Sequence, residues 1–199
     1  MEAKGHGRMM TVCACEFLGT ALFIFGILQT SLPLSIPFSL LASVVIWGDI
    51  TGGHFNPAVT IAVYTSLGEY GKNFLFMVLI IVAQFLGGIL AIGLSYLGNF
   101  GKPDPTAPFL CPTNPVTGKP DNVDNQEFAM DLAVITNEIV CTFVFISVIL
   151  MVKGQHTAGD RVGIGAAFCV VVTLLCCIVG TNKFGAAFNP AVGVALTTN

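Results

Sequence analysis

Long runs of apolar residues alternate with short polar stretches along the whole chain of 199 residues. A helix that crosses the hydrocarbon core of a bilayer requires about 20 consecutive apolar residues. Five runs come near this length and predict five membrane-spanning helices, at about residues 11–32, 34–50, 74–98, 128–152 and 162–180. The pattern therefore predicts an all-α membrane protein that lies in a lipid bilayer.

The composition agrees with a chain that lies in lipid. Hydrophobic residues make up 54% of it and charged residues 10%, with a mean hydropathy of +0.84, whereas soluble domains carry about 25% charged residues. The first apolar run follows Lys4 and Arg8, as in a secretory signal, but Glu16 interrupts it and the run is longer than the apolar part of such signals. We therefore interpret this run as the first spanning helix.

Charge and cysteine placement exclude several classes of function. The net charge is −3, and neither a basic block nor a glycine-rich phosphate loop occurs, so nucleic acid and nucleotides are not expected partners. Of the seven cysteines, only Cys111 lies in a long loop, and no spaced cluster of cysteine and histidine is present. We expect no metal site, no cofactor and no disulfide framework.

The chain contains an internal repeat. The segment "EFLGTALFIF" begins at Glu16 and aligns with "EIVCTFVFIS", which begins at Glu138. The five residues "FNPAV" occur around Asn56 and again around Asn189. The repeat predicts one domain over residues 1–199, divided into a first repeat (1–98), a polar connecting loop (99–127) and an incomplete second repeat (128–199).

The two repeats are expected to be inverted in the membrane. Three spans in the first repeat place the start of the second on the opposite face, and inverted repeats bring matching loops together at the midplane. The positive-inside rule predicts a cytoplasmic N-terminus, because more lysines and arginines lie on that side than on the other: Lys4, Arg8, Lys72, Lys153 and Arg161 against Lys102, Lys119 and Lys183.

Each copy of "FNPAV" is expected to begin a short helix. Asparagine is a good helix N-cap, and proline is favoured directly after it, so Asn56 and Asn189 are each placed to start a helix. The apolar piece that follows Pro57 ends near residue 67 and is too short to span a bilayer. A half-membrane helix fits it better, although a single Asn-Pro pair is often only a turn.

Inverted repeats would bring the N-termini of the two half-helices together at the bilayer centre. Each N-terminus carries about half a positive charge, so the meeting point repels cations, while the carboxamides can donate hydrogen bonds to a passing molecule. A water that accepts both bonds points its hydrogens away from the centre, which interrupts a proton-conducting chain. The small residues beside the caps let them approach closely. The predicted central filter consists of Asn56, Pro57, Ala58, Asn189, Pro190 and Ala191.

Two carboxylates lie within predicted spanning helices, at equivalent places in the repeat. Irregular backbone at membrane depth requires partners inside the protein, and a carboxylate at that depth also requires one. We expect Glu16 and Glu138 each to accept backbone N–H bonds from a re-entrant loop. His54 either lines the pore or is satisfied within its own loop, and the sequence leaves both alternatives open.

The boxes "GGHFNPAV" and "GAAFNPAV", with the two Glu-x-x-x-Thr helices, resemble the aquaporin or major intrinsic protein family. The resemblance covers nearly the whole chain. It implies a right-handed helical bundle with two re-entrant half-helices, in a homotetramer with one pore per subunit. It further implies passive conduction of water or small neutral solutes, with Asn56 and Asn189 as the central filter and Glu16 and Glu138 as loop supports.

The same resemblance implies a second, outer constriction at Ile36, Cys177, Ala186 and Val192. Family members usually carry an arginine at the position of Val192, whereas valine supplies neither a donor nor a charge. We expect a wider, apolar constriction that discriminates less against solutes larger than water, so that ion exclusion rests on the central dipoles. Cys177 is either a mercury-sensitive pore residue or an inert cysteine of the fifth helix.

The second repeat stops ten residues after Asn189, before a sixth spanning helix. We expect a fragment or an incomplete gene model rather than a natural five-helix variant. The favoured function is a passive water channel that excludes protons and ions. The alternatives are a broader channel for glycerol, urea, ammonia or peroxide, and a non-conducting structural or regulatory membrane protein. An intramembrane enzyme is disfavoured, because the repeat alone explains the paired carboxylates.

Overall fold

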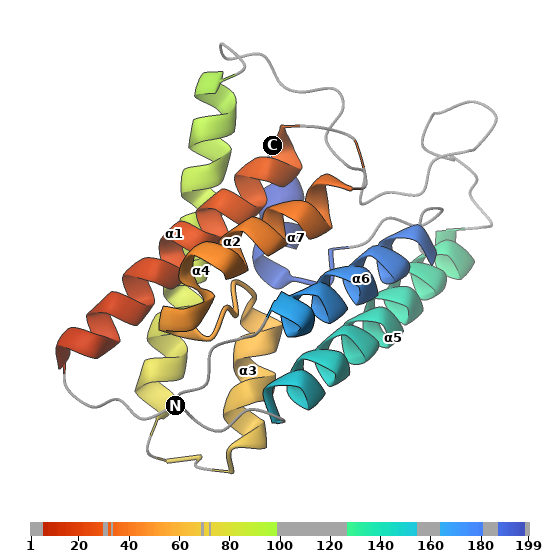
Figure 1. Cartoon of the computed structure of the whole chain (residues 1–199). Coiled ribbons are helices and arrows are strands. Elements are labelled where there is room, and N and C mark those ends of the chain that lie inside the picture. Colours follow the sequence, from red (N-terminus) through yellow and green to blue (C-terminus); the bar gives the residue numbers. More distant parts are fainter. Residues whose placement is uncertain are drawn as a thin grey trace.

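The structure is a computed structural model that describes residues 6–29, 32, 34–68, 70–71, 73–98, 127–154, 164–180 and 187–197. Within these residues the secondary structure is entirely helical (Figure 1). The helices are α1 (His6–Leu28), α2 (Ser35–Thr51), α3 (Pro57–Ser66), α4 (Phe74–Gly98), α5 (Glu127–Gly154), α6 (Ile164–Gly180) and α7 (Pro190–Thr197). The predicted all-α class is confirmed.

Helix length separates spanning helices from shorter ones. Three segments are long and apolar enough to cross a membrane, namely Gly7–Leu28, Phe74–Gly98 and Val134–Lys153. Helices α2 and α6 have 17 residues each, at the lower end of the roughly 17–25 residues that a spanning helix uses. Helices α3 and α7 have 10 and 8 residues, which at about 1.5 Å per residue reach only about half of a 30 Å hydrocarbon core.

Helix α1 organises the first part of the bundle, because it packs against both α2 and α4 (Figure 1). Its close approach to α4 depends on Gly87, where a Cβ atom would overlap the carbonyl oxygen of Phe17. Small residues allow such backbone approach between membrane helices. In the second part, α5 packs along α6, and α6 contacts α2. The short helices α3 and α7 contact each other and both pack on α4, while α3 also contacts α5 and α7 also contacts α1.

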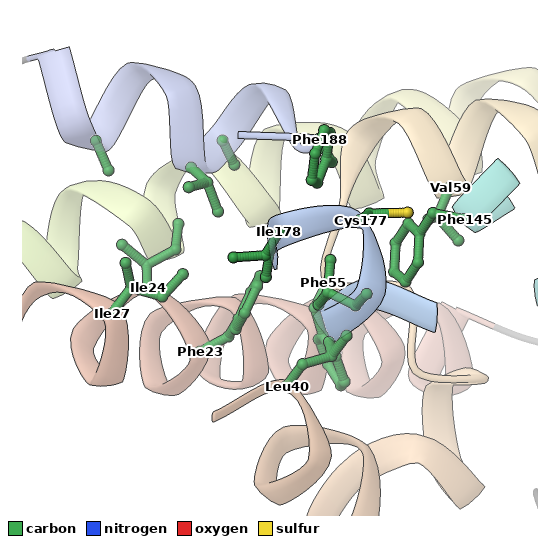
Figure 2. Packing of buried hydrophobic residues seen from close by; sticks show 14 of the residues in the cluster. Phe23, Ile24, Ile27, Leu40, Phe55, Val59, Phe145, Cys177, Ile178 and Phe188 are labelled. Carbon is green, nitrogen blue, oxygen red and sulfur yellow. The ribbon is translucent and has the colours of Figure 1, made fainter. Parts of the chain in front are cut away.

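One apolar cluster joins the two short helices to the long ones. The rings of Phe55 and Phe188, which precede the two half-helices, are both buried in it (Figure 2). Phe55 lies against Gly19 of α1, where any Cβ would overlap the ring. The loops before α3 and α7 are therefore held by side-chain packing as well as by hydrogen bonds.

Several predicted features lie outside the described residues. Ala186 of the expected outer constriction is one of them, and almost the whole connecting loop is another. Of the positive residues behind the expected orientation, only Arg8 and Lys153 are described.

Candidate pore

The first Asn-Pro box forms a helix start of the expected kind. Asn56 has an extended backbone and is the N-cap of α3, with Pro57 at the first helical position. Its Oδ1 accepts the backbone N–H of Ala58 at 2.8 Å. Phe55, directly before it, has a φ of 45°, which a bulky residue adopts only where its surroundings hold it.

The second box repeats this geometry at the start of α7. Oδ1 of Asn189 accepts the backbone N–H of Ala191 at 3.0 Å, and Phe188 has a φ of 47°. The carbonyl oxygens of Asn56 and Asn189 each accept the first intrahelical bond, from Thr60 and Gly193, at 3.0 and 2.9 Å. The same five residues therefore adopt the same local backbone conformation in both copies.

The two boxes are joined by a reciprocal pair of hydrogen bonds. Nδ2 of Asn56 donates to the carbonyl oxygen of Phe188 at 2.9 Å, and Nδ2 of Asn189 donates to the carbonyl oxygen of Phe55 at 2.9 Å. The N-termini of α3 and α7 therefore meet. Each carboxamide carries two N–H hydrogens, and only one of them is used in this cross-link.

A carboxylate from a long helix holds each loop. Glu16 accepts the backbone N–H groups of His54 and Phe55 at 3.0 and 2.8 Å. Glu138 accepts those of Ala187 and Phe188 at 2.6 and 3.0 Å. Charge-assisted bonds to two consecutive N–H groups are strong, and they offset the strain of the left-handed phenylalanines.

The sequence reasoning missed Gln84, which completes the first of these sites. Its Nε2 donates to Glu16 at 2.8 Å and to Thr60 at 2.9 Å. Thr60 Oγ1 lies 3.2 Å from Nδ1 of His54, so α1, α3, α4 and the loop share one buried network. The signal that could have revealed it is an isolated amide in the middle of the apolar run of α4.

A cavity passes along both boxes. Its volume is about 50 Å³, against roughly 10–15 Å³ for one water molecule, so it has room for a few water molecules. His54, Asn56, Lys153 and Asn189 are its lining residues with polar side chains. The other lining residues are glycines or have apolar side chains: Phe23, Ile36, Leu40, Val44, Gly52, Gly53, Phe145, Ile149, Val152, Ala167, Val170, Val171, Leu174, Ile178, Ala187, Phe188, Val192 and Leu196.

A family model described as "Major intrinsic protein" matches residues 5–198. The chain belongs to the major intrinsic protein family. Family membership and the apolar helices together make it an integral, multi-pass membrane protein.

Several members of the family are similar over most of this chain. Aquaporin-8 of Rattus norvegicus is 29% identical over 193 residues, covering 90% of this chain and 66% of the relative. Aquaporin Z of Photorhabdus laumondii is 28% identical over 208 residues, with coverage of 94% and 84%. Glycerol uptake facilitator protein-like 6 of Lactiplantibacillus plantarum is 28% identical over 192 residues, with coverage of 88% and 78%. The chain spans about two thirds of the length of the aquaporin-8 relatives.

Of the four positions that the family resemblance assigns to an outer constriction, three are described, and two of these line the cavity. Ile36 and Val192 both line it. Cys177 does not, because its thiol is directed to α5, where Sγ donates to the carbonyl oxygen of Cys141 at 3.8 Å. Figure 2 shows its sulfur pointing toward Phe145, whereas Ile178 points the other way, toward Phe23. The structure thus places Ile178 at the cavity instead of Cys177.

The opposite end of the cavity carries a charge that the sequence analysis used only for orientation. Helix α2 separates Ile36, at its start, from Gly52, just past its end, by about 24 Å of helical rise. We call the end at Gly52, His54 and Lys153 the inner mouth. Nζ of Lys153 lies 3.2 Å from where a Cβ of Gly52 would stand. His54 is only 3% exposed, bonded through one ring nitrogen and lining the cavity.

Proposed function

We propose that the chain forms a passive channel for water and small neutral solutes, in which Asn56 and Asn189 are the filter that excludes protons and ions. The observation that carries the proposal is the reciprocal Asn56 and Asn189 cross-link at the cavity. The names of the relatives support it, since two of them are called aquaporins and a third a glycerol uptake facilitator. The proposed role is transport, without catalysis or a cofactor.

The filter works through orientation and charge. The N-termini of α3 and α7 each carry about half a positive charge, and both point at the cavity. The second N–H hydrogen of each carboxamide donates to the oxygen of a passing water. That water turns its own hydrogens outward, so a continuous proton relay breaks at the centre. A cation meets two positive helix ends and no carboxylate among the described lining residues.

Further features of the proposed channel are based on membership of the family. We propose a homotetramer in the bilayer, with one pore per subunit and a cytoplasmic N-terminus, which places the inner mouth on the cytoplasmic side. The positive charges that are described, Arg8 and Lys153, support this orientation through the positive-inside rule.

Stopped-flow light scattering on proteoliposomes tests the water channel. The matched control is the double variant Asn56→Asp, Asn189→Asp, because aspartate still caps a helix but has lost the carboxamide donors. We expect fast osmotic shrinkage for the natural chain and a large loss of it in the variant. Circular dichroism shows whether both proteins keep their helices. Equal water permeability of the two proteins would remove the proposed filter.

A broader range of solutes is the second candidate, and Val192 favours it. Val192, Ile36 and Leu196 line the cavity without any donor or charge, so they do not narrow it through hydrogen bonds. We expect the natural chain to pass glycerol and urea, and Val192→Arg to reduce both flows several-fold more than the water flow. Equal uptake of glycerol before and after the substitution would contradict this reading of Val192.

A further inference from the structure

Lys153 is the one formally charged side chain among the described residues that line the cavity. It lies at the C-terminal end of α5, and the structure shows no hydrogen bond or ion pair for it with any described residue. Nζ stands beside Gly52, in the part of the cavity that leads to Asn56. An ammonium group in this position has donors to offer, and no carboxylate lining the described cavity neutralises it.

The imidazole of His54 lies near the same point beside Gly52 as this ammonium group. The single hydroxyl hydrogen of Thr60 is donated to the carbonyl oxygen of Asn56 at 3.1 Å, so Nδ1 of His54 donates to Thr60 across 3.2 Å. Nε2 then carries the lone pair, and it lies 3.7 Å from the same Cβ position of Gly52 that Nζ of Lys153 approaches. Both nitrogens therefore lie near the same point beside Gly52, where a lone pair at Nε2 is compatible with a nearby ammonium group and an N–H at Nε2 would oppose it.

The carboxylate of Glu16 attracts the ammonium group of Lys153 but does not reach the cavity. Glu16 is 0% exposed, and its two oxygens already accept bonds from His54, Phe55 and Gln84. It lies behind the loop and does not line the cavity. Among the described residues, the positive groups that face the cavity from the inner mouth to the filter are therefore Lys153 and two helix N-termini.

We propose that Lys153 makes the inner mouth a binding site for small monovalent anions, with simple carboxylates such as formate as the chemical type, and that its charge keeps cations away from the filter. One anion oxygen accepts a charge-assisted hydrogen bond from Nζ. This site supplies, at the opposite end of the cavity, the fixed positive charge that Val192 lacks. Its effect on transport rests on the proposed channel function, but the binding itself does not.

The proposal is tested by measuring how far small solutes of similar size but different charge inhibit water flow. Proteoliposomes of the natural chain, of Lys153→Met and of Lys153→Arg are assayed with formate, neutral formamide or cationic guanidinium, each normalised to the same protein without solute. We expect formate to slow water flow in the natural chain and in Lys153→Arg, and formamide and guanidinium not to. In Lys153→Met the formate affinity should fall roughly tenfold or more, as for loss of one hydrogen bond to a charged group. Arg8→Met, which removes an exposed charge away from the cavity, should leave the formate effect as it is.

A binding measurement separates this proposal from the channel function. Line broadening of ¹³C-formate by the protein in nanodiscs needs no water flow, and we expect it for the natural chain and a strong reduction for Lys153→Met. Equal broadening by both proteins overturns the anion site, as does equal inhibition by formate in the flow assay. If the protein shows no water flow but still broadens the formate signal in a way that depends on Lys153, the proposed channel function is wrong and the proposed anion site stands.

Discussion

The loops that carry Asn56 and Asn189 share a backbone but have different surroundings. Each loop has a left-handed phenylalanine, an asparagine cap and a glutamate that accepts two consecutive N–H groups. The glutamate of the first loop, Glu16, is fully buried and receives a third donor from Gln84. Glu138 is only partly buried, and it borders two open grooves of about 210 and 420 Å³.

This difference shows that the residues of the box determine the backbone of the loop, whereas the surrounding helices determine how deeply its glutamate is buried. The cap and the turn depend on four or five neighbouring residues, and these are almost identical in the two copies. The depth of burial depends on the long helix that covers the glutamate, and in the first copy that helix is α4. We therefore expect the first loop to be the more rigid and the more sensitive to substitution.

The largest effect is expected from the matched pair Glu16→Gln and Glu138→Gln. An amide keeps the shape but loses one acceptor oxygen, so a backbone N–H in each loop loses its bond. Around Glu16 no water can replace it, and we expect a loss of about 3 kcal/mol in the free energy of unfolding, against about 1 kcal/mol at the more accessible Glu138. Thermal unfolding in detergent micelles measures both, and equal losses would contradict the comparison.

The close contact between α1 and α4 at Gly87, which we call the seam, should be the next most sensitive to substitution. Gly87→Ala places a methyl group against the carbonyl oxygen of Phe17, and overpacking of this kind costs about 2 kcal/mol. Gly93→Ala is the control on the same helix, since nothing lies within 4 Å of its Cβ position. It should be neutral or slightly stabilising, because alanine is the better helix former. Similar unfolding temperatures for the two variants would show that the seam does not support the first loop.

Removing Gln84 should make the two loops more alike. Gln84→Met keeps the side-chain length in α4 but removes the donors to Glu16 and Thr60. A double-mutant cycle with Glu16→Gln should give a coupling energy of about 1–2 kcal/mol. The same cycle of Gln84→Met with Glu138→Gln is the control, and we expect it to be additive. Additivity in both cycles would show that Gln84 is not what separates the loops.

The smallest difference between two matched variants is expected for the valines that end the two boxes. Val59 is 1% exposed within the core, and Val192 is 3% exposed but borders the cavity. Val59→Ala leaves a new void, whereas Val192→Ala only enlarges an existing space. We expect losses of about 2 and about 1 kcal/mol respectively. Unfolding titrations in mixed micelles would resolve this difference, and the reverse order would contradict the assignment of Val192 to the cavity.

Prediction from sequence succeeded where a short stretch specifies its own geometry. The apolar runs indicated the helices, and Asn56 before Pro57 indicated an N-cap that the backbone does adopt. Prediction was less successful where the rotation of a helix about its axis determines which side chain faces the cavity. Cys177 and Ile178 are neighbours, about 100° apart around α6, and counting positions from Asn189 could not show which of them faces the cavity. Lys153 was noted only as a positive charge, because its position beside Gly52 depends on how α5 packs.

The sequence by itself determined that this chain is a helical membrane protein with two capped half-helices and a valine at the end of the second box. Those features follow from the length of apolar runs and from bonds between residues two to four positions apart. The tertiary structure decided that Asn56 and Asn189 bond to each other's loops across 132 and 134 positions, and that Gln84 closes only the first site. It also placed Lys153 at the inner mouth. Contacts at such separations depend on the packing and rotation of several helices at once, which no short stretch of sequence specifies.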